Sequence, residues 1–363
     1  MSLLFEPITI GSLSLRNRVM RSATAERLAA PETGAPGPRL AAMYHALAEG
    51  GVGLIVTGHA YVHRGGKAHP EMASIADDAV IDAWRAVVRP AQDAGARVIM
   101  QINHCGASCD PTVTPAPISP SGIATNDNVS PRAMTQGEIE EVVEAFGRAA
   151  ARARAAGLDG VQIHAAHGYL VSQFLTPSTN RREDAWGGDP GRRRAALGAV
   201  LDAVRRHAGD DYPLWVKLGV AGHAASGLTA VEGAGAAVVA FDHGADCVEV
   251  SHALGVPEEL AGNGEANFLP LARAVRDAVG AGQPLALVSR LRSREVMDAV
   301  LSEGVAQLVS LCRPLILEPD LPNRLRNGAA SAARCVRCGR CWPAAPGEGV
   351  GCHNRAMRGG RCE

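Results

Sequence analysis

The 363-residue sequence has neither a long apolar run nor a strong net charge. No uninterrupted apolar segment reaches the roughly 20 residues that a membrane-spanning helix needs, and the start MSLLFEPITIG lacks the basic segment and apolar run of a secretory signal. With 36 Lys and Arg against 37 Asp and Glu, the chain has no basic surplus that would attract a nucleic acid. We therefore predict a cytoplasmic protein that binds neither membranes nor nucleic acids.

The sequence also lacks the glycine pattern of a Rossmann dinucleotide-binding domain. That pattern, G-x-G-x-x-G, follows a strand and opens a helix. The nearest match, GVGLIV at residues 51–56, has its glycines before the apolar residues and no third glycine. Any phosphate-bearing cofactor must therefore be held in another way.

Short apolar segments alternate with segments of helical periodicity along most of the chain. Eight segments are predicted strands, at residues 18–22, 53–57, 97–102, 160–164, 213–219, 246–251, 284–289 and 307–311. Thr135 and Glu138 form a capping-box pattern before an apolar helical stripe, and Ser293 is a candidate cap of a helix that ends at Gly304. Alternating strands and helices indicate a parallel sheet. Eight repeats favour a (β/α)8 TIM barrel over a doubly wound sheet.

Two further segments complete the predicted organisation. Residues 5–15, FEPITIGSLSL, alternate around a Gly-Ser turn and predict a small N-terminal hairpin. The end of the chain is rich in cysteine, so we predict a barrel over residues 1–328 and a short cysteine-rich extension over residues 329–363.

A dense group of polar side chains follows the fourth predicted strand. His164, His167 and Tyr169 lie in HAAHGYL, where the strand ends and a loop begins. Chemistry in TIM barrels gathers at the carboxyl ends of the strands, and two imidazoles with a phenol suit polarising a carbonyl group and supplying a proton. Alternatively, the histidines are structural or ligate a metal, although no nearby carboxylate or cysteine completes a ligand set.

The longer segment HAAHGYLVSQFLTPSTNRREDAWGG, residues 164–188, resembles the signature of the old yellow enzyme family of flavin-dependent ene-reductases. The resemblance covers roughly residues 3–325 and implies a TIM barrel that binds FMN and is reduced by NAD(P)H. It also implies that His164 and His167 hold the oxygen of the substrate and that Tyr169 donates a proton.

The resemblance assigns cofactor contacts to the ends of other strands. Gln101 would bind the pyrimidine ring of the flavin, and Lys217 stands where a cation, usually arginine, faces N1 and O2. The loops after strands seven and eight would hold the phosphate, and Arg313 suits that task. The full set of predicted cofactor-binding residues is Ser22, Ala23, Thr24, Gly58, Gln101, Lys217, Ser289, Arg290, Cys312 and Arg313. Alternatively, Lys217 is a rim lysine or a Schiff-base lysine of an aldolase, and Arg313 forms a surface ion pair.

Five of the nine cysteines lie in the last 29 residues. Cys335, Cys338, Cys341 and Cys352 have the spacing C-x2-C-x2-C-x10-C, which suits a [4Fe-4S] cluster. Zinc also takes four thiolates, redox-sensing or unligated thiols are a third reading, and Cys362 is a substitute fourth ligand. The chain resembles 2,4-dienoyl-CoA reductases and trimethylamine dehydrogenase-like enzymes, in which a similar run holds a [4Fe-4S] cluster. This resemblance implies a separate electron-transfer partner, because the chain ends soon after the run.

Several functions are compatible with these residues. The leading prediction is an FMN-dependent oxidoreductase that reduces the activated C=C bond of a small-molecule enone or enoyl thioester, with Tyr169 as the proton donor. The alternatives are a dehydrogenase of amines or ring ketones that passes electrons through the cluster, an aldolase that uses Lys217, and a non-catalytic barrel that binds FMN or metal. His252 is a candidate second acid because it lies at the barrel rim.

Overall fold

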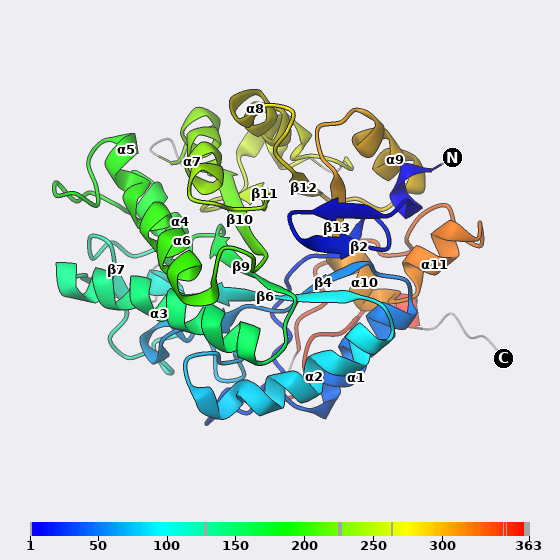
Figure 1. Cartoon of the computed structure of the whole chain (residues 1–363), viewed down its shortest axis with the longest axis horizontal. Helices are drawn as coiled ribbons and strands as arrows, with labels where there is room; N and C mark the ends of the chain where they lie inside the picture. Colours follow the sequence, from blue (N-terminus) through cyan, green and yellow to red (C-terminus); the bar gives the residue numbers. More distant parts are fainter. Residues whose placement is uncertain are drawn as a thin grey trace.

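The computed structural model describes residues 2–126, 129–223, 227–262, 264–343, 345 and 347–358. Within them, eight parallel strands close into a barrel (Figure 1). The strands are β3 (Val19–Arg21), β4 (Leu54–Val56), β6 (Arg97–Asn103), β9 (Gly160–Ala165), β10 (Leu214–Ala221), β11 (Cys247–His252), β12 (Leu285–Val288) and β13 (Leu308–Leu311). Closure follows because β3 pairs with both β4 and β13, and β4 pairs with β6. The predicted TIM barrel is confirmed, and each predicted strand overlaps its observed counterpart.

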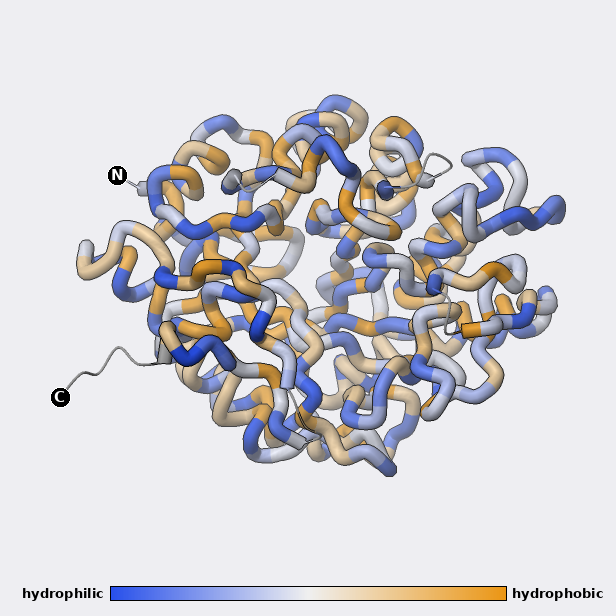
Figure 2. The backbone as a smooth tube through the Cα atoms, turned by 180° about the vertical axis from the view of Figure 1, so that it is seen from behind, coloured by the Kyte–Doolittle hydropathy of each residue, from blue (hydrophilic) through white to orange (hydrophobic). Residues whose placement is uncertain are grey.

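Helices cover the outside of the barrel. They are α1 (Pro38–Glu49), α2 (Ile81–Asp93), α3 (Gln136–Ala155), α6 (Ala195–Ala208), α7 (Ala230–Asp242), α8 (Leu269–Val279), α9 (Arg294–Ser302), α10 (Arg313–Leu317) and α11 (Leu321–Arg326), with the short α4 (Leu170–Leu175), α5 (Pro190–Arg193) and α12 (Arg355–Arg358). Along the outer helices hydrophobic and hydrophilic residues alternate within a turn (Figure 2), as expected for helices with one buried face. Three short strands are not predicted from the sequence: β5 (Ala60–Tyr61), which pairs with the end of β6, and β7 (Ile118–Ser119) and β8 (Arg132–Ala133), which pair with each other.

The two predicted helix caps have different outcomes. Thr135 and Glu138 form the complete capping box at the start of α3, as the sequence indicates. Ser293 stands directly before α9, but its hydroxyl bonds to Glu265 rather than to a helix N–H group. The predicted position of the α9 start is confirmed, whereas the predicted side-chain cap is wrong.

The N-terminal hairpin closes one end of the barrel. Strands β1 (Ile8–Ile10) and β2 (Leu13–Leu15) pair antiparallel around Gly11, whose positive φ of 55° favours glycine. Apolar residues of the hairpin pack with barrel residues from the beginnings of the strands, among them Met20 and Trp215. This end of the barrel is filled by apolar packing, so the opposite end is left for polar groups.

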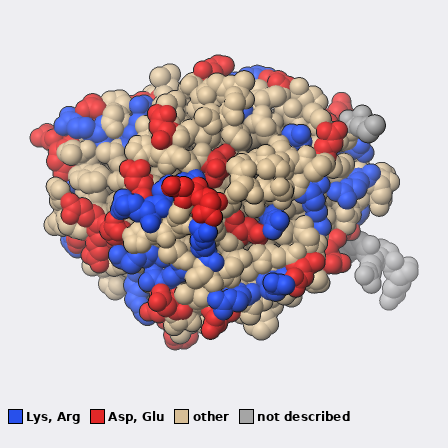
Figure 3. Space-filling model, in the orientation of Figure 1, with Lys and Arg blue, Asp and Glu red and all other residues tan. Residues whose placement is uncertain are grey.

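No helix in the described part of the chain combines the length and apolarity needed to cross a lipid bilayer. On the face seen in Figure 3, acidic and basic side chains are intermixed rather than gathered into one patch. This distribution agrees with the near-neutral net charge of the sequence.

Candidate active site

The barrel interior changes from apolar to polar along each strand. Side chains alternate between the two faces of a strand, so residues two apart face the same way. Trp215 begins the inward row of β10 and Lys217 follows it, while Cys247 begins the inward row of β11 and Glu249 follows it. Ser310 holds the corresponding place on β13 after Leu308. The polar positions form a layer across the carboxyl end of the barrel, where TIM barrels carry their chemistry.

His164, His167 and Tyr169 converge at the end of β9. His164 is the next-to-last residue of the strand and is 3% exposed, and Lys217 is its register partner on β10. The ring of His164 lies 5.1 Å from that of His167 and 4.8 Å from that of Tyr169, both edge-on. His167 itself adopts a positive φ of 59°, followed by Gly168 at 73°, which turns the chain sharply. The structure therefore brings together the three residues that the sequence predicts for catalysis.

Burial sets the protonation of all three groups. It holds the pKa of His164 well below its usual value, and the nearby His59, Lys217 and His252 lower that pKa further. Desolvation likewise lowers the pKa of His167 and raises the pKa of the Tyr169 phenol. Both imidazoles are neutral and the phenol is protonated at neutral pH, so all three can donate hydrogen bonds.

The hydrogen bonds orient the two histidines differently. His167 has its Nε2 2.8 Å from the Ser251 hydroxyl, and its backbone N–H donates to the His252 carbonyl at 3.1 Å. His164 has a buried Nδ1 that finds no hydrogen-bond partner among the described residues. A buried polar atom without a partner is costly, so the Nδ1 of His164 is placed to bind an external group.

Two further histidines border this cluster. The ring of His59, which follows β4, lies 5.1 Å from Tyr169 and 6.1 Å from His164. Desolvation lowers the pKa of His59 to about 4, so it is also neutral. The ring of His252 lies 4.6 Å from that of His167. Sequence reasoning assigns His59 no role, because nothing local shows that the loop after β4 brings it to the ring of Tyr169.

Lys217 is held by a buried carboxylate. Its Nζ donates to Glu249 at 3.1 Å and to the Ser22 hydroxyl at 2.6 Å. The same Glu249 oxygen accepts from Ser22 at 2.7 Å and from Ser310 at 2.7 Å. Sequence reasoning identifies Lys217 and Ser22 but misses Glu249 and Ser310, whose only local signal is a polar residue at an inward position of an apolar strand.

Gln101 joins this network from the other side of the barrel. Its Nε2 donates to Gln162 at 2.8 Å, and Gln162 in turn donates to the second oxygen of Glu249 at 3.0 Å. The backbone register places Gln101 directly beside Gln162 on β6 and β9. Donors that the sequence assigns separately to a flavin ring are therefore linked through one carboxylate.

The loops after β3 and β4 carry the remaining predicted ring contacts. The Thr24 hydroxyl donates to the Ser22 carbonyl at 3.2 Å and lies 3.1 Å from the Cys312 sulfur. Ala23 is half-buried beside them. Gly58 donates its N–H to Glu26 at 2.7 Å, and a Cβ at Gly58 would come within 1.7 Å of that carboxylate. The structure gives Gly58 a packing role, while a contact with flavin stays a prediction.

Arg290 and Arg313 line one cavity beside Cys312, at the ends of β12 and β13. This is the place that the sequence predicts for a phosphate. The Ser289 hydroxyl is used differently: it accepts from the Phe268 N–H at 2.5 Å and donates to the Asn267 side chain at 3.1 Å. Ser289 therefore fixes the loop before α8 through its side chain.

These groups fit FMN. Lys217 and Gln101 carry polar groups within one buried network, the buried Nδ1 of His164 has no partner among the described residues, and Arg290 and Arg313 line the cavity where a phosphate would lie. A flavin has a hydrogen-bonding ring edge and an anionic tail, so its chemistry matches this set of donors.

The cysteine-rich extension does not show a metal centre. Among the described residues, no three His, Cys, Asp or Glu side chains are arranged to hold a metal ion. Burial first, and then the charges of Cys335, Cys312 and Cys352, raise the pKa of Cys341 to about 11. Cys338 is exposed. Cys362 lies outside the described residues.

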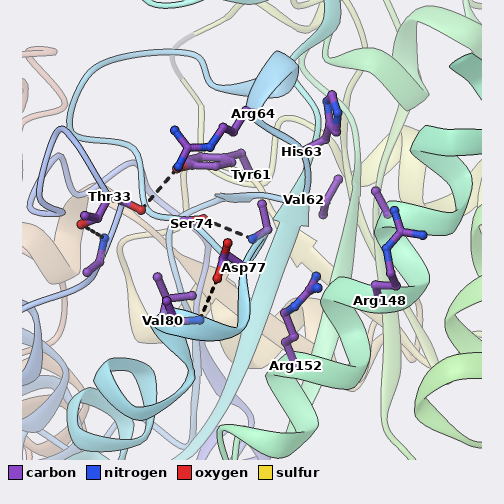
Figure 4. A pocket seen from close by; sticks show the side chains of 14 residues that line it. Thr33, Tyr61, Val62, His63, Arg64, Ser74, Asp77, Val80, Arg148 and Arg152 are labelled. Atoms are coloured by element: carbon purple, nitrogen blue, oxygen red, sulfur yellow. Dashed lines mark hydrogen bonds between the residues drawn. The ribbon is translucent and has the colours of Figure 1, made fainter.

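A larger cavity of about 490 Å³ lies outside this site, between α3 and the loops around β5 (Figure 4). Arg148 and Arg152 enter it from α3, and Tyr61 and Arg64 line the other wall. None of the predicted catalytic or cofactor residues lines it. The side chains predicted for catalysis gather at the barrel mouth instead, away from this cavity.

A TIM barrel with two histidines and a tyrosine at the end of its fourth strand, a cation on its fifth and arginines after its last two has the features of a flavin-binding barrel. The chain belongs to the NADH:flavin oxidoreductase / NADH oxidase family, which matches residues 3–331. This match confirms the family resemblance that the histidine–tyrosine segment indicates.

Individual relatives agree with this membership. A "Metal reductase" of Desulforamulus reducens is 33% identical over 344 residues, which are 93% of this chain and 51% of the relative. An "NADPH dehydrogenase" of Geobacillus thermodenitrificans is 34% identical and covers 88% of this chain and 93% of its own. The chain thus spans about half the length of some relatives and nearly all of others.

Solved structures show the same barrel. A 2-naphthoyl-CoA reductase complex superposes with a TM-score of 0.85 and 27% identity, over 90% of this chain and 52% of that one. Morphinone reductase superposes with a TM-score of 0.79 and 26% identity, over 92% of each chain.

Proposed function

We propose that this chain is an FMN-dependent oxidoreductase that takes electrons from NAD(P)H and reduces the C=C bond of an α,β-unsaturated carbonyl compound. The observation that carries the proposal is the convergence of His164, His167 and Tyr169 at the end of β9, where Lys217 of the Lys217–Glu249 pair is the register partner of His164. Bound FMN would supply the hydride that the β-carbon of the substrate receives.

His164 and His167 hold the carbonyl oxygen of the substrate in this proposal. Both are neutral at pH 7 because burial depresses the pKa of each imidazole. A neutral imidazole donates one N–H bond without bringing a fixed charge, and two such donors stabilise the negative charge that develops on the oxygen. The contact with Ser251 keeps the ring of His167 in place while it does so.

Tyr169 gives the proton that the α-carbon needs. Its ring lies against both His164 and His59, which fixes the direction of the phenol. Because burial raises the pKa of Tyr169 above its ordinary value of about 10, the phenol carries its proton throughout the physiological range. A positioned acid of this kind contributes roughly 10²- to 10⁴-fold to a rate.

Lys217, Ser22 and Gln101 orient the ring of the cofactor. The Lys217 ammonium is ion-paired with Glu249, so it is not a free amine for Schiff-base chemistry. This pairing disfavours the aldolase alternative and supports a positive group at the ring edge that becomes anionic on reduction.

The names of the relatives support both the electron donor and the electron acceptor of the proposed reaction. The "NADPH dehydrogenase" relatives support a nicotinamide donor, and the 2-naphthoyl-CoA reductase complex supports thioesters as one acceptor class.

Anaerobic titration tests the proposal. The protein reconstituted with FMN should bleach with NADH or NADPH and regain its colour with an enone or an enoyl thioester. A protein that binds no FMN would contradict it.

A second candidate is oxidation of an amine or a ring ketone, with electrons passing through a [4Fe-4S] cluster in the extension to a separate carrier. The C-x2-C-x2-C spacing and the proximity of Cys335, Cys341 and Cys352 support a metal centre. Among the described residues these thiols do not form a group of three that could hold a metal ion. Iron, sulfide and zinc analysis of anaerobically purified protein separates a cluster from zinc and from free thiols.

The non-catalytic alternative, a barrel that stores or relays electrons, makes a distinct prediction. It requires no proton donor, so Tyr169→Phe would leave every property unchanged. A loss of turnover in that variant with flavin binding retained would rule it out.

A further inference from the structure

The cavity at the ends of β12 and β13 is bordered by a third arginine, which comes from the cysteine-rich extension. Arg337 lies between Cys335 and Cys338 in sequence and lines the cavity together with Arg290 and Arg313. The cavity holds about 50 Å³, well above the roughly 10–15 Å³ that one water needs. Among the described residues that line it, there is no Asp or Glu.

Contacts on both sides of the cavity bring Arg337 there. The backbone of Ala332 bridges Ser293 in the loop after β12. Two residues later, the N–H and guanidinium of Arg334 donate to Glu318, at the end of α10, at 2.7 and 3.1 Å. The chain therefore crosses from the β12 side of the cavity to the α10 side just before Arg337. There the Arg313 guanidinium donates a hydrogen bond to the Arg337 carbonyl at 3.4 Å.

Three arginines line this one cavity, and the Arg337 guanidinium also donates to the Gly264 carbonyl at 3.5 Å. Their like charges repel one another. Burial lowers the pKa of Arg290, and the nearby Arg337 and Arg313 lower it further. Like charges brought together are stabilised by a bound anion, and arginine forks match the oxygens of a phosphate.

We infer that Arg337 is a third phosphate-binding residue, so that the cysteine-rich extension takes part in holding the phosphate of FMN at the barrel mouth. The inference rests on the proposed flavin function and extends it to a residue outside the barrel. It makes the phosphate affinity of the protein dependent on how the extension is folded against β12, β13 and α10.

Arg340 provides a matched control. It occupies the equivalent position of the next C-x-x-C spacing, between Cys338 and Cys341, but it is exposed and does not line the cavity. Riboflavin provides a matched ligand, because it has the ring of FMN without the phosphate. The experiment titrates flavin-free full-length protein with FMN and with riboflavin and follows the quenching of flavin fluorescence.

In Arg337→Gln, the dissociation constant of FMN should rise about tenfold, the factor that one lost charge-assisted contact gives, while that of riboflavin stays unchanged. Arg337→Lys should lose less FMN affinity, since lysine keeps the positive charge but not the bidentate guanidinium. Arg340→Gln should bind both ligands as the wild type does. Unchanged FMN affinity in Arg337→Gln, or an equal loss with riboflavin, would overturn the inference. If the wild type binds neither flavin, the proposed function itself fails; if it binds both equally, only the phosphate site fails.

Discussion

The Lys217 ammonium and the Glu249 carboxylate form an ion pair of 3.1 Å inside the barrel mouth, and their side chains are 3% and 0% exposed. Glu249 also accepts hydrogen bonds from residues of three other strands or strand ends, Ser22, Gln162 and Ser310. One carboxylate thus organises the polar layer on which the proposed flavin ring would lie.

Removing this carboxylate should destabilise the fold. In Glu249→Gln the buried Lys217 loses its partner, and breaking a buried pair in this way costs about 3–5 kcal/mol. Urea denaturation followed by tryptophan fluorescence measures the loss. The double variant Lys217→Met with Glu249→Leu should recover much of it, because no unpaired charge remains. A single variant as stable as the wild type would show that the pair does not organise the site.

Replacing Tyr169 by Phe should separate the two halves of the reaction. The ring contacts with His164 and His59 remain, but no proton is donated. Stopped-flow measurements should show unchanged flavin reduction by NAD(P)H and a reoxidation by enone that is slower by about 10²-fold or more. An equal slowing of both half-reactions would point to a packing defect instead.

Buried histidines should make the protein sensitive to acid. Desolvation lowers the pKa of His59 to about 4 and the pKa of both His69 and His104 to about 3. In the unfolded chain each takes up a proton below about pH 6.5, so the unfolded state binds more protons between about pH 6.5 and 4. The contribution of these neutral histidines to the free energy of unfolding is therefore fully present above pH 6.5. It is lost as the pH drops through this window.

Urea midpoints measured between pH 7.5 and 5 check this expectation. Each such histidine contributes a slope of up to about 1.4 kcal/mol per pH unit. His104→Asn keeps an acceptor for the Gly106 N–H and should reduce the slope, whereas His45→Asn, at an exposed position, should not. A pH-independent midpoint in the wild type would contradict the burial of neutral imidazoles.

The parts of the fold that could be predicted depend on local patterns. The strands are apolar segments bounded by turn residues, and the Thr135–Glu138 capping box marks the start of α3. Both the strands and this helix start can therefore be predicted from the sequence. The Ser293 hydroxyl does not cap α9, because Glu265, 28 residues away, competes for it. A competitor that distant leaves no local signal.

The candidate site shows the same limit. His164, His167 and Tyr169 are close in sequence, and a long motif carries their resemblance. Glu249 is joined to Ser22 across 227 positions of the chain, and only the closure of the barrel brings the two together. Arg337 lies between Cys335 and Cys338, which the sequence predicts as metal ligands, and its approach to Arg313 depends on how the extension crosses the β12 and β13 loops.

The most direct measurement is an anaerobic absorbance titration of the FMN-reconstituted protein. Our account predicts a flavin spectrum that bleaches with NADH or NADPH and returns, under argon, when an α,β-unsaturated ketone or thioester is added, with the saturated carbonyl compound as product. A flavin that stays reduced in the presence of every such acceptor would contradict the proposed reaction, and a protein that takes up no flavin would contradict the site itself.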